Sequence, residues 1–344
     1  MNILGIETSC DETAAAVVKD GRFILSNVVA SSLQDHKKYG GVIPEIASRR
    51  QLDFMNDVVE NALSGARLSL HALDAIAVTM YPGLIGSLLV GISFARALSY
   101  ALDIPLIKVD HIQAHLYANF LISRKKHNAP SQPADLPDLP AIGLVVSGGH
   151  TSLYHIKNFH RFRIIGETLD DAVGEAYDKV ARILDLGYPG GPAIDRLAQR
   201  QTMASRTQAR ARAKTGQPRF TCAELPGTLN FSFSGIKTAV FYYKRDHQND
   251  SHFSVPEIVS SFQESIVKVL VKKCVTACIK LKSPTLIVGG GVAANSRLRQ
   301  RLAEEAVSHR IKVYFPPLSL CTDNAAMIAG LGFHLISQRS ELYA

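Results

Sequence analysis

The chain has 344 residues, of which 47% are hydrophobic and 20% charged, and its formal net charge is +8. This composition is ordinary for a soluble globular protein with room for two domains, and it excludes a chain built mainly of membrane spans. The excess of basic residues favours a polyanionic partner such as nucleic acid, although charge alone is a weak signal.

Three features favour a cytoplasmic protein that does not enter a membrane. The stretch Met1–Cys10 has no basic region followed by an apolar run, so no signal peptide is expected. The most apolar long stretch, Leu84–Leu102, contains Arg96 and several small residues, which predicts a buried helix. The five cysteines are odd in number and widely spread, as reduced core thiols would be.

The first part of the chain predicts a meander of three short strands, a helix, a strand, a glycine loop, a second helix and a closing strand. Apolar runs and Asp/Gly turns mark these elements. The expected ranges, in that order, are Ile3–Ser9, Ala14–Val18, Phe23–Val29, Pro44–Ser64, Ala75–Thr79, Pro82–Gly86, a helix to Leu102, and Leu106–Val109.

The same order of elements recurs further along the chain. Three strands are expected first, then a helix, and much later a strand, a glycine loop, a helix and a closing strand. Their expected ranges are Ala141–Val146, Thr151–Ile156, Arg163–Glu167, Asp171–Leu184, Thr285–Val288, Gly289–Gly291, Val292–Val307 and Ile311–Phe315.

This internal repeat predicts a duplicated α/β fold of the actin/Hsp70/sugar-kinase type (the ASKHA, ribonuclease H-like architecture), with two lobes around a nucleotide cleft. The alternative is an unrelated α/β protein with a coincidental strand order. We expect the first lobe over 1–120, with a C-terminal helix at about 324–344 packing back on it. A linker would span 121–140, and the second lobe 141–323 would carry a basic insertion at about 196–222.

Two histidines and an aspartate are candidate metal ligands. His111 and His115 are four residues apart, which places them on one face of a helix. His111 follows the closing strand of the first half, and Asp323 lies shortly after that of the second half. Loops after strand carboxyl ends open onto the ligand crevice of α/β sheets, so a His-His-Asp site is expected there. Such a site suits Fe²⁺, Zn²⁺ or Mn²⁺.

Two enzyme classes are disfavoured by missing residues. A zincin helix requires glutamate directly after its first histidine, and this chain has Ile112 there. No Walker loop ending in Lys-Ser/Thr is present, although glycine turns at 148–149, 190–191 and 289–291 lie beside polar residues that could reach a nucleotide.

A basic strip occupies the inserted segment, which is expected to be a loop. Seven Lys/Arg residues lie between 196 and 219 with no acidic residue among them. They are either solvated charges or contacts for an RNA backbone, and Arg206, Arg210 and Arg212 are the candidate tRNA-binding residues. The run Arg124–Lys126 is a shorter candidate of the same kind.

A set of ordered motifs resembles the TsaD (Gcp/YgjD) family of tRNA N6-adenosine threonylcarbamoyltransferases, from residue 5 to about 332. The motifs are Ile6–Thr13, Tyr39–Glu45, Pro82–Leu84, His111–His115, Val146–Thr151, Gly174–Lys179, Tyr188–Pro192, Phe231–Gly235, Gly289–Asn295 and Cys321–Asn324. So many motifs in one order make the resemblance highly specific.

The resemblance implies transfer of a threonylcarbamoyl group from threonylcarbamoyl-AMP to N6 of the adenosine at position 37 of tRNAs that read ANN codons. It implies one divalent metal per subunit, Fe²⁺ or else Zn²⁺, on His111, His115 and Asp323. It also implies a paralogous partner of the same fold, TsaB, and an ATPase, TsaE. The adenylate contacts it implies are Val145, Val146, Ser147, Gly148, Gly149, Asp178, Gly191, Asp195 and Asn295.

Asp11 and Glu12, on the first turn, are candidates for handling the proton in this reaction, with a plain turn-forming role as the alternative. Two other functions compete with the transferase. A carbohydrate kinase or ATPase of the same fold would use magnesium bound by carboxylates, which the His-His-Asp set argues against. A non-catalytic scaffold would not need an intact metal set.

Overall fold

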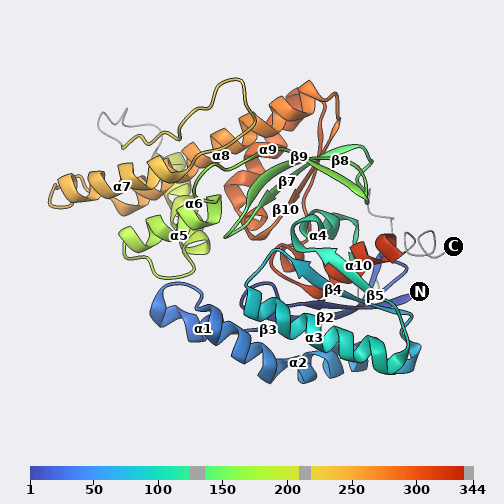
Figure 1. Cartoon of the computed structure of the whole chain (residues 1–344). Coiled ribbons are helices and arrows are strands. Elements are labelled where there is room, and N and C mark those ends of the chain that lie inside the picture. The colour runs from blue at the N-terminus through green and yellow to red at the C-terminus, as the bar shows by residue number, and fades with distance from the viewer. Residues whose placement is uncertain (124–135, 209–217, 337–344) are drawn as a thin grey trace. The chain divides into compact units, whose positions relative to one another are not determined.

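The computed structural model describes residues 1–123, 136–208 and 218–336 (Figure 1). Contacts divide the chain into two compact units. Unit 1 comprises Met1–Leu139, Ile156–Phe162 and Pro316–Ala344, and unit 2 comprises Pro140–His155 and Arg163–Phe315. The domain boundaries expected from the sequence stay a prediction.

Unit 1 is built on a six-stranded sheet in the order β5-β4-β1-β2-β3-β6. Strands β1, β2 and β3 are antiparallel, whereas β4 and β5 continue the sheet in parallel with β1. The strands span Asn2–Glu7 (β1), Glu12–Lys19 (β2), Phe23–Ser31 (β3), Ala75–Tyr81 (β4), Leu106–Asp110 (β5) and Ile122–Ser123 (β6).

The central strands of unit 1 are apolar on both faces because helices cover both sides of the sheet. Leu4 and Ile6 of β1 belong to one core with residues of α2 (Pro44–Ala66) and α3 (Ile85–Leu102). Gly5 faces the opposite side of the sheet, where α10 (Ala325–Leu335) packs on β1 and β2 so closely that a side chain at Gly5 would meet its backbone. The short helices α1 (Leu33–His36), η1 (Lys37–Tyr39), η2 (Leu70–Ala72), α4 (His111–Tyr117), η3 (Ala118–Phe120) and η5 (Leu318–Leu320) complete the unit.

Unit 2 is built on a five-stranded sheet in the order β11-β10-β7-β8-β9, which repeats the order of the first five strands of unit 1. The strands span Ala141–Val146 (β7), Thr151–Asn158 (β8), Arg161–Glu167 (β9), Thr285–Gly289 (β10) and Lys312–Tyr314 (β11). The helices span Val173–Ile183 (α5), Gly190–Gln208 (α6), Ser234–His247 (α7), Val255–Lys280 (α8), Gly291–Ala294 (η4) and Ser296–Ser308 (α9).

Helix α3 corrects the prediction of a buried helix. Its buried face is narrow, formed by Ser87, Gly91, Ile92 and Ala95, and the helix packs on β4 and α2. Ile85 is 78% exposed and Leu89 57%. Small residues form most of the fully buried stripe, Leu88, Phe94 and Leu98 pack at its margins, and Ile85, Leu89 and Tyr100 are exposed. By length and composition alone, this is the one helix among the described residues that qualifies as a membrane span.

Two further predictions fail in unit 2. The basic segment is helical through Gln208 rather than a loop from residue 196 onward, because Ile194 and Ala198 lie one turn apart and are buried on the side of α6 that packs on α8. The helix expected from Val292 begins at Ser296, since Asn295 accepts a hydrogen bond from the Leu298 N–H and caps it. Helices α7 and α8 were not predicted at all.

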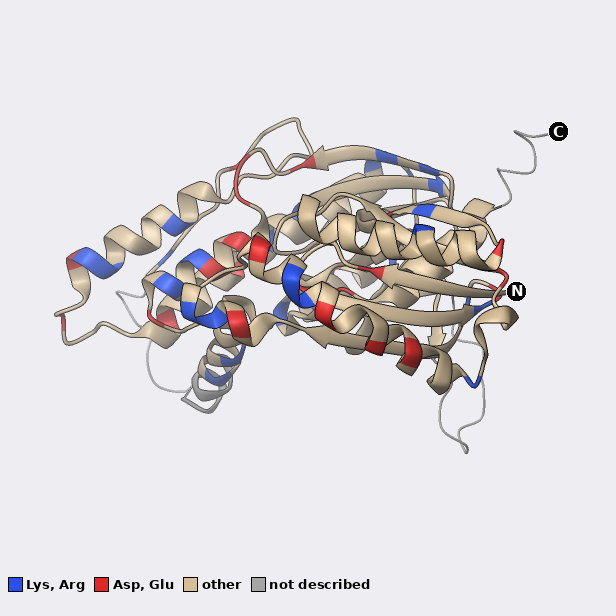
Figure 2. Cartoon of the chain, turned by 60° about the horizontal axis from the view of Figure 1, so that its bottom comes forward, with Lys and Arg blue, Asp and Glu red and all other residues tan. Residues whose placement is uncertain are grey.

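Acidic and basic residues occur together on several helices, such as α2 and α5 (Figure 2). Arg49 pairs with Glu45 on α2, and Lys179 pairs with Glu175 on α5. Such exposed pairs contribute little to stability, but they neutralise much of the local charge.

Candidate functional site

Two helix caps in unit 1 hold the predicted metal ligands. The Asp110 carboxylate accepts a hydrogen bond from the Gln113 N–H at 2.9 Å and starts α4 at His111. The Asn324 side chain accepts from the Met327 N–H at 3.1 Å and starts α10 directly after Asp323. These caps fix the backbone at both ligand segments, and α4 packs against α10.

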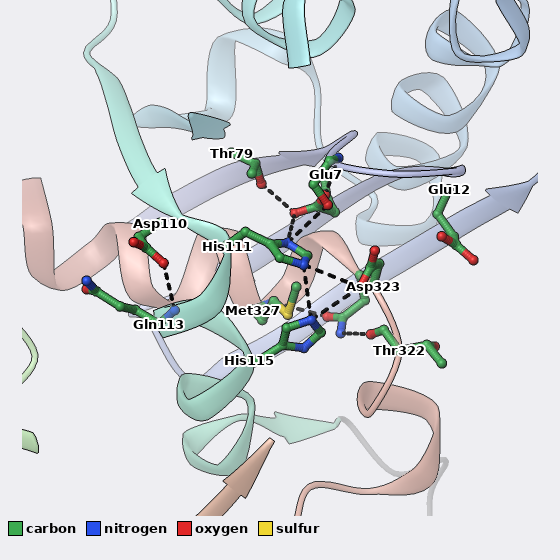
Figure 3. A network of polar contacts seen from close by, with 12 residues as sticks. Glu7, Glu12, Thr79, Asp110, His111, Gln113, His115, Thr322, Asp323 and Met327 are labelled. Atoms are coloured by element: carbon green, nitrogen blue, oxygen red, sulfur yellow. Dashed lines mark hydrogen bonds and ion pairs between the residues drawn. The ribbon is translucent and has the colours of Figure 1, made fainter. Parts of the chain in front are cut away.

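The three predicted ligands converge on one point in unit 1 (Figure 3). The Nε2 atoms of His111 and His115 are 3.2 Å apart. The Asp323 carboxylate lies 3.2 Å from His115 Nε2 and 3.6 Å from His111 Nε2. The histidines are buried, whereas the Asp323 side chain is 20% exposed, so the cluster opens on the aspartate side.

These separations fit a metal ion. Ligand atoms at about 2.0–2.1 Å from a tetrahedral metal lie about 3.3 Å from one another. Two imidazole nitrogens and a carboxylate also match the donor set that Fe²⁺ and Zn²⁺ accept, with further coordination positions left open. The residues present therefore fit the divalent metal predicted from the sequence.

Glu7 and Thr79 extend the cluster on the side of His111 that faces away from His115 (Figure 3). The Glu7 carboxylate is 1% exposed and lies 3.0 Å from His111 Nδ1, and Thr79 donates its hydroxyl hydrogen to the same carboxylate. Burial lowers the pKa of His111, but the charges of Glu7 and Asp323 outweigh it and raise that pKa to about 9. A metal ion bound at Nε2 would replace this proton.

Side chains of other residues bind the backbone carbonyls of the turn that carries Asp11 and Glu12. Gln51 Nε2 donates to the carbonyls of Cys10 and Glu12, both at 3.0 Å, and Ser32 Oγ donates to the Asp11 carbonyl at 2.8 Å. Burial raises the pKa of Glu12 to about 10, and the negative charges of Asp323 and Asp11 act in the same direction.

The predicted adenylate residues all belong to unit 2, around the ends of two adjacent strands. Strands β7 and β10 are parallel, and the loops after them approach closely. Gly290 has φ +93°, and a Cβ there would lie 2.4 Å from the Val146 carbonyl oxygen, so glycine is required. Gly148 and Gly149 have open space at their Cβ positions, which leaves the turn after β7 accessible.

Asp178 and Asp195 connect the glycine turns to the helices of unit 2. Asp178 Oδ1 accepts a hydrogen bond from the Gly190 N–H at 2.7 Å, at the start of α6. Asp195 accepts from the Ser296 N–H at 3.2 Å and from Ser296 Oγ at 2.9 Å, at the start of α9. Burial raises the pKa of Asp178, and the backbone donors of Gly190 and Gly191 oppose this rise.

The Asn295 side chain, like those of Asp178 and Asp195, has structural partners. Its Oδ1 caps α9 through the Leu298 N–H, and its Nδ2 donates to Gln263 Oε1 at 2.9 Å. The structure thus gathers Asp195 and Asn295 at the start of α9, and Ser147, Gly148 and Gly149 in the turn after β7. Their contact with a nucleotide stays a prediction.

The predicted tRNA-binding residues gain no structural support. Arg210 and Arg212 lie outside the described residues, as do Lys125 and Lys126. Arg206 belongs to α6, but its side chain is also outside the described part of the chain. Their contact with RNA stays a prediction.

Two residues of the metal cluster were missed by the sequence analysis. Glu7 ends an apolar strand, and a single acid in such a strand is a signal that a buried donor must face it. Thr79 ends the apolar core of β4 and carries no comparable signal, because threonine is common in strands.

The family model for TsaD, described as tRNA N6-adenosine threonylcarbamoyltransferase, matches residues 23–330. The chain belongs to the TsaD family. A TsaD relative from Caldicellulosiruptor saccharolyticus, named tRNA N6-adenosine threonylcarbamoyltransferase, is 45% identical over 100% of this chain and 96% of its own length. A relative of the same name from Fusobacterium nucleatum is 47% identical over 97% of this chain and 91% of its own length.

Solved structures that resemble this TsaD-family chain have low sequence identity and show its fold. Full-length HypF, in a phosphate- and nucleotide-bound form, superposes with a TM-score of 0.59 at 13% identity, over 98% of this chain and 46% of HypF. Component A of the (R)-2-hydroxyglutaryl-CoA dehydratase of Acidaminococcus fermentans gives 0.54 at 13% identity, over 99% of each chain. The predicted actin- and sugar-kinase-like fold is confirmed.

Proposed function

We propose that this chain transfers the threonylcarbamoyl group of threonylcarbamoyl-AMP to N6 of adenosine 37 in tRNAs that read ANN codons. The observation that carries the proposal is the convergence of His111, His115 and Asp323 in a chain of the TsaD family. Family membership supports the transferase reaction on tRNA, and the donor set supports a metal-assisted transfer.

The metal would be held by both histidine Nε2 atoms and the Asp323 carboxylate. We favour Fe²⁺, with Zn²⁺ as the second choice, because two imidazoles and one carboxylate with open positions suit both ions. When bound, such an ion supplies Lewis-acid polarisation of donor oxygens. The protein supplies the fixed caps of α4 and α10, so the ligands need little rearrangement on binding.

The adenylate part of the donor is assigned to unit 2. Gly148 and Gly149 are exposed and have open space at their Cβ positions, and the backbone N–H groups of such glycine turns suit phosphate oxygens. The Asp195 carboxylate, half-buried at the start of α9, is suited to accept hydrogen bonds from ribose hydroxyls. The remaining predicted contacts are Val145, Val146, Ser147, Asp178, Gly191 and Asn295.

In the reaction, the adenine N6 forms a bond to the carbamoyl carbon, the carbon–oxygen bond to the phosphate breaks, and AMP leaves with the electron pair. N6 must also lose one proton. Asp11, 9% exposed, and Glu12, next to it at the start of β2, are the candidates to accept this proton from N6.

The rival functions explain less of the structure. A kinase or ATPase would place carboxylates around magnesium, whereas two buried imidazoles face the Asp323 carboxylate here. A scaffold without activity would not need the converging donor set or the two caps that hold it.

The proposed partners are tRNA, a TsaB-like paralogue and a TsaE-like ATPase, and the proposed location is the cytoplasm. The exposed apolar side chains of α3, Ile85, Leu89 and Tyr100, support a protein partner, because burying them is favourable.

The reaction is tested by incubating the metal-loaded chain, the paralogue and the ATPase with tRNA and threonylcarbamoyl-AMP. Nucleoside analysis should show N6-threonylcarbamoyladenosine in tRNAs that read ANN codons, and its formation should require the metal-loaded chain. Tight co-purification with tRNA and no modified nucleoside under any metal would instead favour the scaffold function. Consumption of ATP coupled to phosphorylation of a sugar would favour the kinase.

A further prediction concerns the adenylate site. Replacing Asp178 or Asp195 with asparagine should weaken AMP binding by about tenfold, because a hydrogen bond to a charged group is worth about 1.5–3 kcal/mol. Metal content should not change, since the ligands belong to unit 1. Calorimetry with AMP measures the effect, and Asp185→Asn, an exposed acid paired with Lys244, is the matched control. Unchanged AMP affinity in both variants would contradict the assignment.

A further inference from the structure

Glu7 is a buried carboxylate with an unusually complete set of donors. It ends β1, and its Oε1 accepts a hydrogen bond from the Ser9 N–H at 2.5 Å. Its Oε2 accepts from the Thr79 hydroxyl and lies 3.0 Å from His111 Nδ1. No route to solvent is open, because Glu7 is 1% exposed and Thr79 is fully buried. A buried carboxylate is stable only with such partners.

These contacts determine which nitrogen of His111 carries a hydrogen. A carboxylate only accepts hydrogen bonds, so Nδ1 must donate to it. Ser9 Oγ, 3.2 Å from the same Nδ1, offers a second acceptor. The lone pair of a neutral His111 is therefore on Nε2, the atom that faces His115 Nε2 and Asp323.

His115 provides an internal contrast. Its Nδ1 is buried and has no hydrogen-bond partner among the described residues. Nothing in the described part of the chain therefore selects the tautomer of His115, whereas the Glu7 carboxylate selects the tautomer of His111. The two histidines lie on one helix and face the same proposed metal position, but only the His111 ring is held at Nδ1 by a hydrogen bond among the described residues.

We propose that Glu7 is the positioning residue that presents His111 Nε2 to the metal. The inference rests on the proposed metal site, and it assigns to β1 a role that neither the family match nor the ligand cluster assigns. Carboxylates behind metal-binding histidines orient the ring, and losing one typically weakens metal binding by about 10–100-fold.

Glu7→Gln is the sharpest test because the glutamine amide cannot satisfy every neighbour. The Ser9 N–H is a fixed backbone donor, so it selects the amide oxygen. The amide NH₂ group then faces His111 Nδ1 and competes with the hydrogen there. We expect Zn²⁺ affinity, measured by competition with a chelator, to fall by about 10–100-fold.

Thr79→Val is the matched control. It removes a donor to the same carboxylate but leaves His111 its acceptor, so Zn²⁺ affinity should stay within about threefold of the unmodified chain. Equal affinity in Glu7→Gln and the unmodified chain would overturn the proposal, and so would an equal loss in both variants.

Nitrogen-15 NMR of the Zn²⁺-loaded, histidine-labelled chain tests the proposal without a variant, in case Glu7→Gln does not fold. His111 should show a hydrogen on Nδ1, slow to exchange with solvent, and zinc on Nε2. Zinc on Nδ1 would overturn the role of Glu7. The metal site itself is tested separately by His111→Ala. Loss of zinc there, with full retention in Glu7→Gln, would remove the role of Glu7 and leave the site intact.

Discussion

Replacing His111 with alanine is expected to reduce bound transition metal from about one ion per chain to near zero. The substitution removes one of three protein ligands and leaves Glu7 buried without its imidazole partner. Threonylcarbamoyl transfer should fall by about a hundredfold or more, because several kcal/mol of transition-state stabilisation depend on the bound metal. Elemental analysis of the purified variant and nucleoside analysis of tRNA measure the two effects.

His71→Ala is the matched control, since His71 is exposed in unit 1 and lies outside the ligand cluster. Its metal content should equal that of the unmodified chain. His115→Ala should lose metal as His111→Ala does. Full metal retention in both ligand variants would show that the ion, if any, binds elsewhere.

The second large effect is expected from Gly5→Ala. A Cβ on Gly5 would lie 2.2 Å from the Ala325 carbonyl oxygen and 2.8 Å from the Ala329 backbone nitrogen. Both contacts are with the backbone of α10, which cannot move aside as a side chain would. Overpacking of this kind costs about 3 kcal/mol, or more where the backbone must shift. We therefore expect Tm to fall by about 5 °C or more in calorimetry.

Gly235→Ala is the control for this prediction. Gly235 lies in the first turn of α7, and a Cβ there meets nothing within 4 Å. Its Tm should be unchanged or slightly raised, since alanine is the better helix former. Because α10 begins next to Asp323, Gly5→Ala should also weaken metal binding. A Tm within 1 °C of the unmodified chain would show that α10 is free to shift.

The expected results for His111 and Gly5 both depend on helix α10. Helix α10 covers one face of the unit 1 sheet, and its capped start holds the segment that carries Asp323. Close packing of α10 on Gly5 therefore supports both the stability of unit 1 and the geometry of the ligand cluster.

Local signals in the sequence were sufficient for most strands and for the identity of the ligands. Apolar runs ended by Asp, Asn or Gly turns predicted nearly every strand, because both signals act over a few residues. The spacing of His111 and His115 predicted a shared helix face, and α4 places them so. The recurrence of one element order predicted the duplicated fold, and the two sheets repeat it.

The sequence signals did not predict α8 or the packing face of α3. Helix α8 is apolar on much of its surface, so its buried residues do not stand out as one stripe. Helix α3 was predicted to be buried, but composition does not say which face of a helix packs on a sheet. Ser87, Gly91, Ile92 and Ala95 are the fully buried residues of α3, and Leu88, Phe94 and Leu98 pack beside them while partly exposed.

The sequence by itself determined the order of most elements, without α7 and α8, and the three side chains that converge as candidate metal ligands. Those properties depend on local backbone preferences and on chemistry that each residue carries alone. Tertiary structure alone decided that Glu7 and Thr79 lie behind His111. These neighbours are far apart in the chain, and they meet because the strands of one sheet and the helices packed on it bring distant segments together.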